Sequence, residues 1–298
     1  MAEVARRRLT RTAAPVAPAR RRSVAMRLVS NQRVVVGSAV LLITLFVAVF
    51  AGLIAPYDPN GQLLAERLAG PSAAHPFGED QLGRDVLSRV IYGSRVSLGV
   101  GFSSVAITIV IGTVIGVAAG YFGKWTDNIL MRFVDVFISI PVFMLLLTVV
   151  AIYGSSVVLL VTFIGISAFP GAARIVRAEV LSLMPRDFVL AARVVGASPV
   201  RIMYLHLVPN LLPVIIVSAT LRVGAAILTE AGLSYFGLGV PPPSPTWGGM
   251  VADGRTFLDV GWWISTFPGI ALLVVVVATN LVGDGLRDVF DPRRSQLT

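Results

Sequence analysis

The chain has 298 residues, of which 55% are hydrophobic and only 14% carry a formal charge. This much apolar surface exceeds what one soluble core can bury, so the composition excludes a soluble globular domain and indicates an integral membrane protein. The absence of cysteine excludes disulfides and thiolate catalysis, and two isolated histidines predict no metal site and no redox chemistry.

Residues 1–33 are rich in Arg, Ala and Pro and lack a periodic apolar pattern. They are predicted to be a basic, disordered cytoplasmic tail that is attracted to the membrane surface. The next run, 34–55, is apolar and long enough to cross a bilayer. A cleaved signal peptide is the alternative, but no small-residue cleavage site follows the run, and the sequence PYDP begins at residue 56. We therefore expect an uncleaved first transmembrane helix.

Hydropathy predicts an all-α integral membrane protein with six spans, each mostly apolar with charges near its ends. The fourth span is short and contains Gly165 and Pro170, so either it is tilted against other helices or its limits extend further. The last five spans form one transmembrane domain. In chain order the spans are 34–55, 97–120, 133–153, 156–171, 207–229 and 262–283. The extracytoplasmic segment is 56–93, the transmembrane domain is 94–284 with a cytoplasmic loop at 171–206, and the C-terminal tail is 285–298.

The basic residues define the expected orientation. With the N-terminal tail inside, 19 of the 25 Lys and Arg residues lie on the cytoplasmic side, in the two tails and in the loops 124–132 and 171–206. This distribution follows the positive-inside tendency and predicts cytoplasmic N- and C-termini. The formal net charge of +9 would also suit nucleic acid, but the basic residues lie between apolar runs instead of on one face. We expect the lipid bilayer, and no nucleic acid, as a partner.

The loop 171–206 contains a predicted pair of short helices. Asp187 lies near the positive end of the first helix dipole, and Gly196 permits a backbone turn that a side chain would hinder. Ser198 can cap the second helix, with Pro199 at its first position. The apolar positions at helical spacing are Phe188, Ala191, Ala192 and Val195. The sequence therefore predicts a helix, a bend and a second helix at the membrane surface.

Several runs of sequence carry a resemblance to a known family. They are HPFGEDQLGRDVLSRVIYGSR at 75–95, LAARVVG at 190–196 with Val208-Pro209, EAGLSYFGLGVPP at 230–242, and NLVGDGLRD at 280–288 with DPR at 291–293. From residue 34 to residue 293 the chain resembles the second permease subunit of dipeptide and oligopeptide ABC importers. The basic tail falls outside the resemblance.

The resemblance implies the type I ABC importer permease fold, whose cytoplasmic coupling helices fit a cleft on the ATPase. It implies three kinds of partner: a second homologous permease, two ATP-binding subunits and an extracytoplasmic substrate-binding protein. ATP and Mg²⁺ are then held by the ATPases, and this chain needs no cofactor of its own. The implied function is ATP-driven import of short peptides across the bacterial cytoplasmic (inner) membrane by alternating access.

The same resemblance assigns the ATPase-docking residues to the loop. They are Asp187, Ala191, Ala192, Gly196, Ala197, Ser198 and Arg201. Leu190 departs from the family pattern, which has an acidic residue before the paired alanines. A salt bridge from this position to the ATPase is therefore not expected.

No catalytic residue and no nucleotide site are predicted. The fragment GYFGKW at 120–125 lacks the earlier glycine and the Ser or Thr after Lys124 that a phosphate-binding loop needs. A stand-alone secondary transporter is the alternative from another class, although embedded acids are few and a docking loop would serve no purpose in it. Among ABC permeases, nickel, glutathione or another small solute stays open as the substrate.

Small residues and prolines in the spans leave two interpretations open. Gly112, Gly116 and Gly120 place a smooth stripe on one face of the second span, which favours packing within the bundle over contact with another permease. Pro141 and Pro213 remove backbone hydrogen bonds and predict bends, which are either static or hinges of a gate.

Charged residues in the fifth span are candidates for the translocation path. Arg222 is costly at bilayer depth, so it is predicted either to line the path or to form an internal ion pair. Glu230, eight residues later on roughly the same helix face, is its candidate partner at the exterior end of the path. The exterior segment 230–261 is either a re-entrant gate or a surface loop held by tryptophans at the membrane interface.

Overall fold

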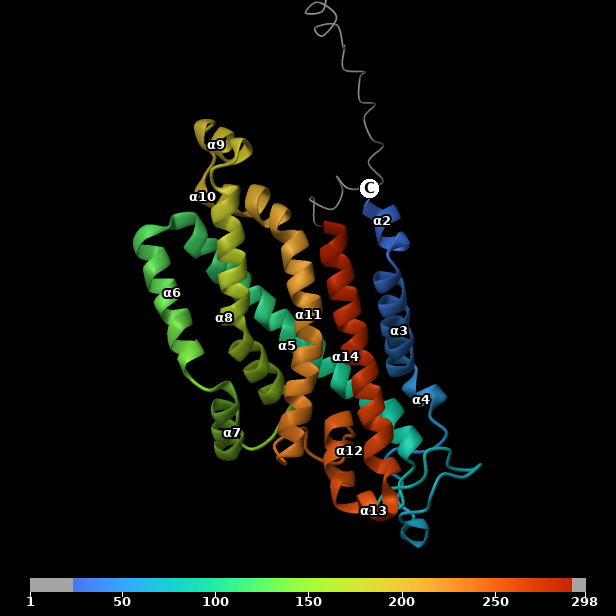
Figure 1. The fold of residues 1–298 in the computed structure, drawn as a ribbon. Coiled ribbons are helices and arrows are strands. Elements are labelled where there is room, and N and C mark those ends of the chain that lie inside the picture. The colour runs from blue at the N-terminus through green and yellow to red at the C-terminus, as the bar shows by residue number, and fades with distance from the viewer. Residues whose placement is uncertain (1–23, 291–298) are drawn as a thin grey trace, which may run out of the picture.

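The computed structural model describes residues 24–290, which are almost entirely helical (Figure 1). The predicted tails at 1–23 and 291–298 lie outside the described residues. The elements are α2 (Val24–Ser30), α3 (Gln32–Val49), α4 (Ala51–Ile54), η1 (Leu64–Glu66), α5 (Val86–Phe122), α6 (Lys124–Ser139), α7 (Val142–Tyr153), α8 (Val157–Leu183), α9 (Asp187–Val194), α10 (Pro199–Ile202), the π-helix η2 (Met203–Leu207), α11 (Val208–Tyr235), α12 (Trp247–Gly254), η3 (Arg255–Phe257), α13 (Leu258–Gly261) and α14 (Trp263–Phe290).

The long helices confirm the predicted all-α membrane fold. Within residues 24–290, five helices are long and apolar enough to cross a membrane, and α6 with α7 adds a sixth span if the bent pair is counted as one. They occur in the predicted order. The fourth span does extend beyond residue 171, because α8 continues to Leu183 with Pro170 inside it.

Several boundaries differ from those expected, among them that of the N-terminal tail and that of the extracytoplasmic segment. Val24–Ser30 forms α2, which packs against α3 and α14, whereas the sequence predicted disorder through residue 33. The extracytoplasmic segment was predicted to end at 93, but α5 begins at Val86 and runs unbroken for 37 residues. Asp85 starts this helix by accepting a hydrogen bond from the Ser88 backbone N–H at 2.7 Å.

The third span is broken at Pro141, as its proline predicted. Helices α6 and α7 meet at an angle of 75°, and Pro141 has an extended backbone immediately before α7. Pro213 behaves differently, since it lies inside α11 without ending that helix. Helix α7 packs mainly against α8, so few neighbouring helices oppose the bend at Pro141.

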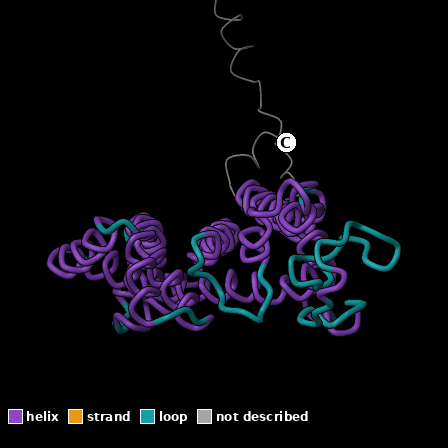
Figure 2. Tube along the Cα trace, turned by 90° about the horizontal axis from the view of Figure 1, so that it is seen from below, coloured by secondary structure: helices purple, strands orange, loops and turns teal. Residues whose placement is uncertain are grey.

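The arrangement in space separates two functional ends of the bundle. Helices α9 and α10 lie at the same end of the bundle as α2 and the end of α14, while α12 and α13 lie at the other (Figure 1). Seen along the helices, the bundle is a wide and shallow layer instead of a closed ring (Figure 2). Its main core joins α5, α8, α11 and α14 through side chains such as Leu98, Leu160, Ile227 and Val275.

The glycine stripe of α5 packs within the bundle, which confirms the favoured interpretation. A Cβ atom on Gly116 would lie 2.6 Å from the carbonyl oxygen of Ala173 in α8, and one on Gly112 would lie 2.5 Å from the Ala172 side chain. Contacts this short leave no room for a side chain. The stripe therefore sets the close approach of α5 and α8.

We expect Gly116→Leu to destabilise the bundle, because the new side chain would meet the backbone of α8. Overpacking of this kind costs roughly 1–3 kcal/mol. Gly99→Leu is the matched control, since a Cβ on Gly99 of the same helix has no neighbour within 4 Å. Thermal unfolding of the two purified variants in detergent, followed by tryptophan fluorescence, measures the difference. Equal unfolding temperatures would show that α5 and α8 do not pack through this stripe.

Candidate functional site

The loop between α8 and α11 folds as the predicted helix, turn and second helix. It comprises residues 184–207, called the coupling loop below, and is shorter than the predicted 171–206 because α8 is longer. Gly196 adopts a φ of 82°, and its N–H donates to the Arg193 carbonyl at 3.0 Å. Ser198 then caps α10 by accepting from the Arg201 N–H at 3.4 Å, with Pro199 first in the helix. The turn therefore has the local chemistry that the sequence predicted.

One face of the coupling loop is buried against the long helices. Val189, Ile202 and Leu207 are fully buried, and Ala192 and Ala197 pack beside them. They meet a cluster contributed by α5, α8 and α11. The other members of this cluster are Val117, Val176, Val180, Leu183 and Leu211. We call these eight buried side chains the anchor cluster, because they fix the loop to three spans.

The apolar positions noted at helical spacing in α9 are not the buried face of this helix. Phe188, Ala191 and Val195 are exposed, although the apolar spacing placed them together with Ala192. Val189 is buried instead, three residues before Ala192. An eight-residue helix with apolar side chains on several sides has more than one possible inner face. Tertiary packing against α8 and α11 decides between them.

The opposite side of the loop presents apolar side chains to the surroundings. Val194 and Val195 are each 87% exposed, Val200 is 69% exposed and Leu190 is 44% exposed. We call these four residues the apolar tip. The sequence analysis did not identify Val194 and Val200 as exposed apolar residues. Leu190 and Val194, an apolar pair four residues apart on a helix too short to bury two faces, could have indicated this exposed surface. Exposed apolar side chains of this kind mark a site of contact with another protein or with a membrane surface.

The residues predicted to dock an ATPase have three different environments in the structure. Asp187, Ala191 and Arg201 are exposed, so they are available to a partner. Ala192 and Ala197 contact the anchor cluster, and Gly196 and Ser198 shape the turn. The small size of Ala192 therefore serves the loop's own packing, and the docking role of the exposed residues stays a prediction.

A cavity of about 780 Å³ lies between α8, α11 and α14. Glu179, Asn210, Arg287 and Phe290 line it at the end of the bundle that carries the coupling loop, and Arg222 lines it near the middle of α11. Arg222 donates from Nε to Ser218 Oγ at 3.1 Å and from Nη1 to the Ala168 carbonyl at 3.2 Å. Among the described residues no carboxylate lies within ion-pair distance of Arg222.

Glu230 lies apart from this cavity. Its side chain is completely buried, and Oε1 accepts a hydrogen bond from the Ser234 hydroxyl at 2.7 Å. The candidate pairing with Arg222 is not formed. Arg222 donates to Ser218 and to the Ala168 carbonyl of α8, and Glu230 accepts from Ser234. Its predicted place on the translocation path stays a prediction, and the structure brings only Arg222 to the cavity.

The exterior segment 230–261 contains a buried helix and not a loose surface loop. Helix α12 packs against α11 and α14, and its Trp247 is 2% exposed. The Trp247 backbone N–H donates to Ser97 Oγ at 3.1 Å, and its indole Nε1 donates to the Val90 carbonyl at 3.0 Å. These bonds hold α12 against α5 at the end of the bundle opposite the coupling loop (Figure 1).

Comparison with known proteins gives two family matches. Residues 112–296 match the family described as binding-protein-dependent transport system inner membrane component. Residues 20–71 match the N-terminal TM domain of oligopeptide transport permease C. Together the matches include the first span and four of the other five, with the coupling loop inside the larger match.

Individual relatives extend this likeness over most of the chain. A dipeptide transport system permease protein of Alkalihalophilus pseudofirmus is 40% identical over 90% of this chain and 88% of its own length. A di/tripeptide transport system permease protein of Pseudomonas aeruginosa is 40% identical over 88% of this chain and 89% of its own. A glutathione transport system permease protein of Pectobacterium atrosepticum is 39% identical over 88% of each chain.

The fold has a counterpart among solved structures. An inward-facing MetNI methionine ABC transporter contains a chain with a TM-score of 0.56 and 22% identity, which covers 68% of this chain and 97% of its own. That likeness confirms the type I importer permease fold. With a family match over more than half of the residues and relatives that are 40% identical along most of their length, the chain belongs to the binding-protein-dependent inner-membrane components of ABC transport systems, in the branch of the dipeptide and oligopeptide permeases.

Proposed function

We propose that this chain is one permease subunit of an ATP-driven importer that carries short peptides across the cytoplasmic membrane. One observation carries the proposal: the apolar tip lies at the same end of the bundle as Asn210 and Phe290, which line the cavity that contains Arg222. A partner that pushes on the tip can thereby change the width of the cavity. Peptides are the proposed cargo because the names of two relatives specify dipeptides and di- or tripeptides.

The partners follow from the shape and the surfaces. A second homologous permease completes the path, since the bundle is a shallow layer and not a closed ring (Figure 2). Two ATPases bind the apolar tips of the two permeases and hold ATP and Mg²⁺, so that this chain is not itself an enzyme. An extracytoplasmic binding protein delivers the peptide at the end formed by α12 and α13. Differential affinity of the ATPases for two states of the complex drives alternating access.

Co-purification tests the assignment to a multi-subunit importer. The full chain, extracted from its own membranes with mild detergent, should carry one second permease and two ATPases, as measured by native mass spectrometry. Cells that lack the chain should lose uptake of a labelled dipeptide. Recovery of a homogeneous single-chain transporter with full uptake activity would overturn the proposal.

We expect the coupling loop and both termini to face the cytoplasm. The chain contains no cysteine, so single substitutions report position without a background. Val29→Cys, at the coupling-loop end, should react with an impermeant maleimide only after cells are permeabilised, whereas Leu63→Cys should react in intact cells. Both side chains are exposed, Val29 by 76% and Leu63 by 52%. The reverse pattern of labelling would contradict the proposed orientation.

Glutathione is the second candidate substrate, because one relative is named as a glutathione permease. Competition separates the two candidates. Unlabelled dipeptide in excess should suppress uptake of labelled dipeptide, and excess glutathione should leave it unchanged. Suppression by glutathione and not by dipeptide would assign the chain to the tripeptide thiol instead.

A further inference from the structure

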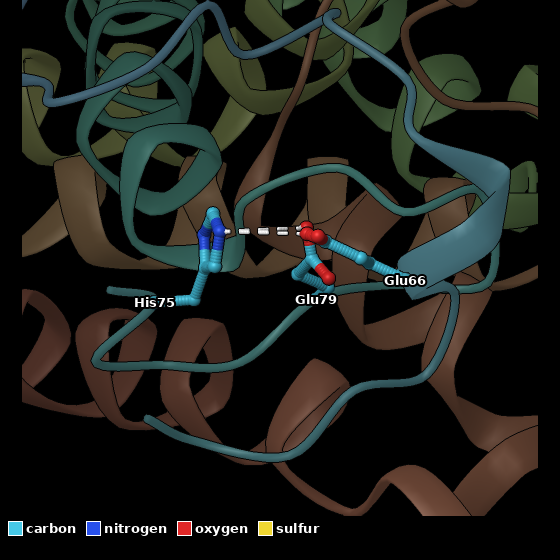
Figure 3. A group of neighbouring side chains, drawn as sticks. All are labelled: Glu66, His75 and Glu79. Atoms are coloured by element: carbon cyan, nitrogen blue, oxygen red, sulfur yellow. Dashed lines mark ion pairs between the residues drawn. The ribbon is translucent and has the colours of Figure 1, made fainter. Parts of the chain in front are cut away.

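The exterior segment brings one histidine and two glutamates to a single point. Glu66 comes from η1, while His75 and Glu79 lie on the loop that leads to α5, and the three side chains point toward one another (Figure 3). His75 Nε2 lies 3.7 Å from Glu79 Oε1 and 3.9 Å from Glu66 Oε2. One potential ligand atom from each residue lies within 4.8 Å of the other two. The group is far from the coupling loop and from the cavity.

The imidazole of His75 is oriented by a fourth residue. Its Nδ1 lies 2.9 Å from Asp85 Oδ1, and Asp85 is itself held by the backbone N–H of Ser88 at 2.7 Å. Because an ionised carboxylate can only accept a hydrogen bond, Nδ1 carries the hydrogen atom and donates a hydrogen bond to Asp85. Nε2 then faces the two glutamates, and in the neutral ring its lone pair is available to a metal ion. A carboxylate behind a histidine is the arrangement that orients imidazole ligands in metal sites.

The distances within the group fit a metal better than a shared proton. A hydrogen bond from a protonated Nε2 would bring each partner oxygen to about 2.7–3.2 Å, and both oxygens lie beyond that range. Ligands bound at about 2.0–2.2 Å in a tetrahedral site lie roughly 3.4 Å from each other. The two separations measured from His75 Nε2, 3.7 and 3.9 Å, therefore need to close by only about 0.3–0.5 Å around a metal, mostly through the flexible Glu66 side chain.

Glu79 supplies an independent reason to expect a cation. Its side chain is 3% exposed, and within the described residues its Oε2 is buried without a hydrogen-bond partner. A buried acceptor without a partner is costly.

The local charge balance also favours a bound cation. The carboxylates of Glu66, Glu79 and Asp85 surround one imidazole, which carries at most one positive charge. The neighbouring Asp80 differs, because Arg84 and Arg89 lie 2.6 Å and 3.5 Å from its Oδ2. A divalent cation would neutralise the excess charge of the first group and give Glu79 its missing partner.

We propose that Glu66, His75 and Glu79 bind a divalent transition-metal ion of the Zn²⁺ type, with Asp85 orienting the histidine. Imidazole with carboxylates suits zinc and its neighbours, whereas Ca²⁺ prefers six to eight oxygen ligands. The ion joins η1 and the 75–79 loop to the start of α5, and so stiffens the exterior segment. The sequence predicted no metal because the histidines are isolated; the fold supplies the remaining ligands as carboxylates.

Zinc binding to the full chain tests this proposal. The chain is purified in detergent through a tag without histidine, treated with a chelator, and titrated with ZnCl₂ in a calorimeter. We expect one bound Zn²⁺ per chain and a higher unfolding temperature when it is bound. Glu66→Gln should weaken binding at least about tenfold, as loss of a supporting group in a zinc site does. Glu66 is the variant of choice because its side chain is 49% exposed, so the substitution leaves the fold intact.

Asp259→Asn is the matched control, because Asp259 is an exposed carboxylate of α13 outside the group. It should bind zinc like the unaltered chain. Glu79→Gln provides a second ligand variant and should also lose affinity. Absence of zinc binding, or binding that Glu66→Gln and Asp259→Asn leave equally strong, would overturn the proposal and make the group a set of ion pairs around a protonated histidine.

Discussion

Val194→Asp should abolish the association of the permease with its ATPases. The Val194 side chain is 87% exposed and has no part in the anchor cluster, so the substitution leaves the fold of the chain unchanged. In the docked complex the new carboxylate would be buried against an apolar surface without a partner, which costs several kcal/mol. We expect the ATPases to be missing from the purified complex and peptide uptake to fall to the level of cells without the chain.

Val29→Asp is the control for this variant. Val29 is 76% exposed on α2, at the same end of the bundle but outside the coupling loop. It should retain the ATPases and normal uptake. If both variants keep the ATPases, the apolar tip is not the docking surface; if both lose them, the charge acts through the membrane surface and not through the loop.

Arg222→Ala should strongly reduce peptide uptake while the complex still assembles. Arg222 faces the cavity from the middle of α11 and has no acidic partner among residues 24–290. We therefore predict that Arg222 contacts the cargo or its water, for example a peptide carboxylate. Loss of one charge-assisted contact of about 1.5–3 kcal/mol corresponds to a decrease in uptake of roughly 10- to 100-fold.

Two further variants separate a path role of Arg222 from a structural one. Ser218→Ala removes the hydroxyl that accepts from Nε but keeps the charge, so uptake should stay near normal. Arg222→Lys keeps the charge and loses the bond to the Ala168 carbonyl, so it should retain partial uptake. If Arg222→Ala transports normally per assembled complex and only unfolds at lower temperature, the residue is a strut between α8 and α11.

The spans could be predicted from sequence because a bilayer imposes its thickness on every crossing helix. The break at Pro141 and the turn at Gly196 are encoded by these residues and their immediate neighbours. Such local signals act over a few positions. They were therefore readable without knowledge of the tertiary structure.

Neither the buried face of α9 nor the group of Glu66, His75 and Glu79 could be predicted from the sequence, and the physical reason is the same for both. Val189 is buried because α8 and α11 stand behind it, and no local pattern of residues 187–194 shows where those helices lie. Likewise, Glu66, His75 and Glu79 meet only because the exterior segment turns back on itself. Burial and close approach depend on contacts between distant segments, which a single sequence does not display.

The anchor cluster has a mechanical consequence. Its side chains are contributed by α5, α8 and α11 as well as by the coupling loop, and most of them are completely enclosed. Close-packed interiors have low compressibility, so a displacement applied to the loop is passed on without being absorbed at its base. We therefore expect a push on the loop to tilt α5, α8 and α11 together as one stiff lever, and we expect any bending to occur at the break beside Pro141, between α6 and α7.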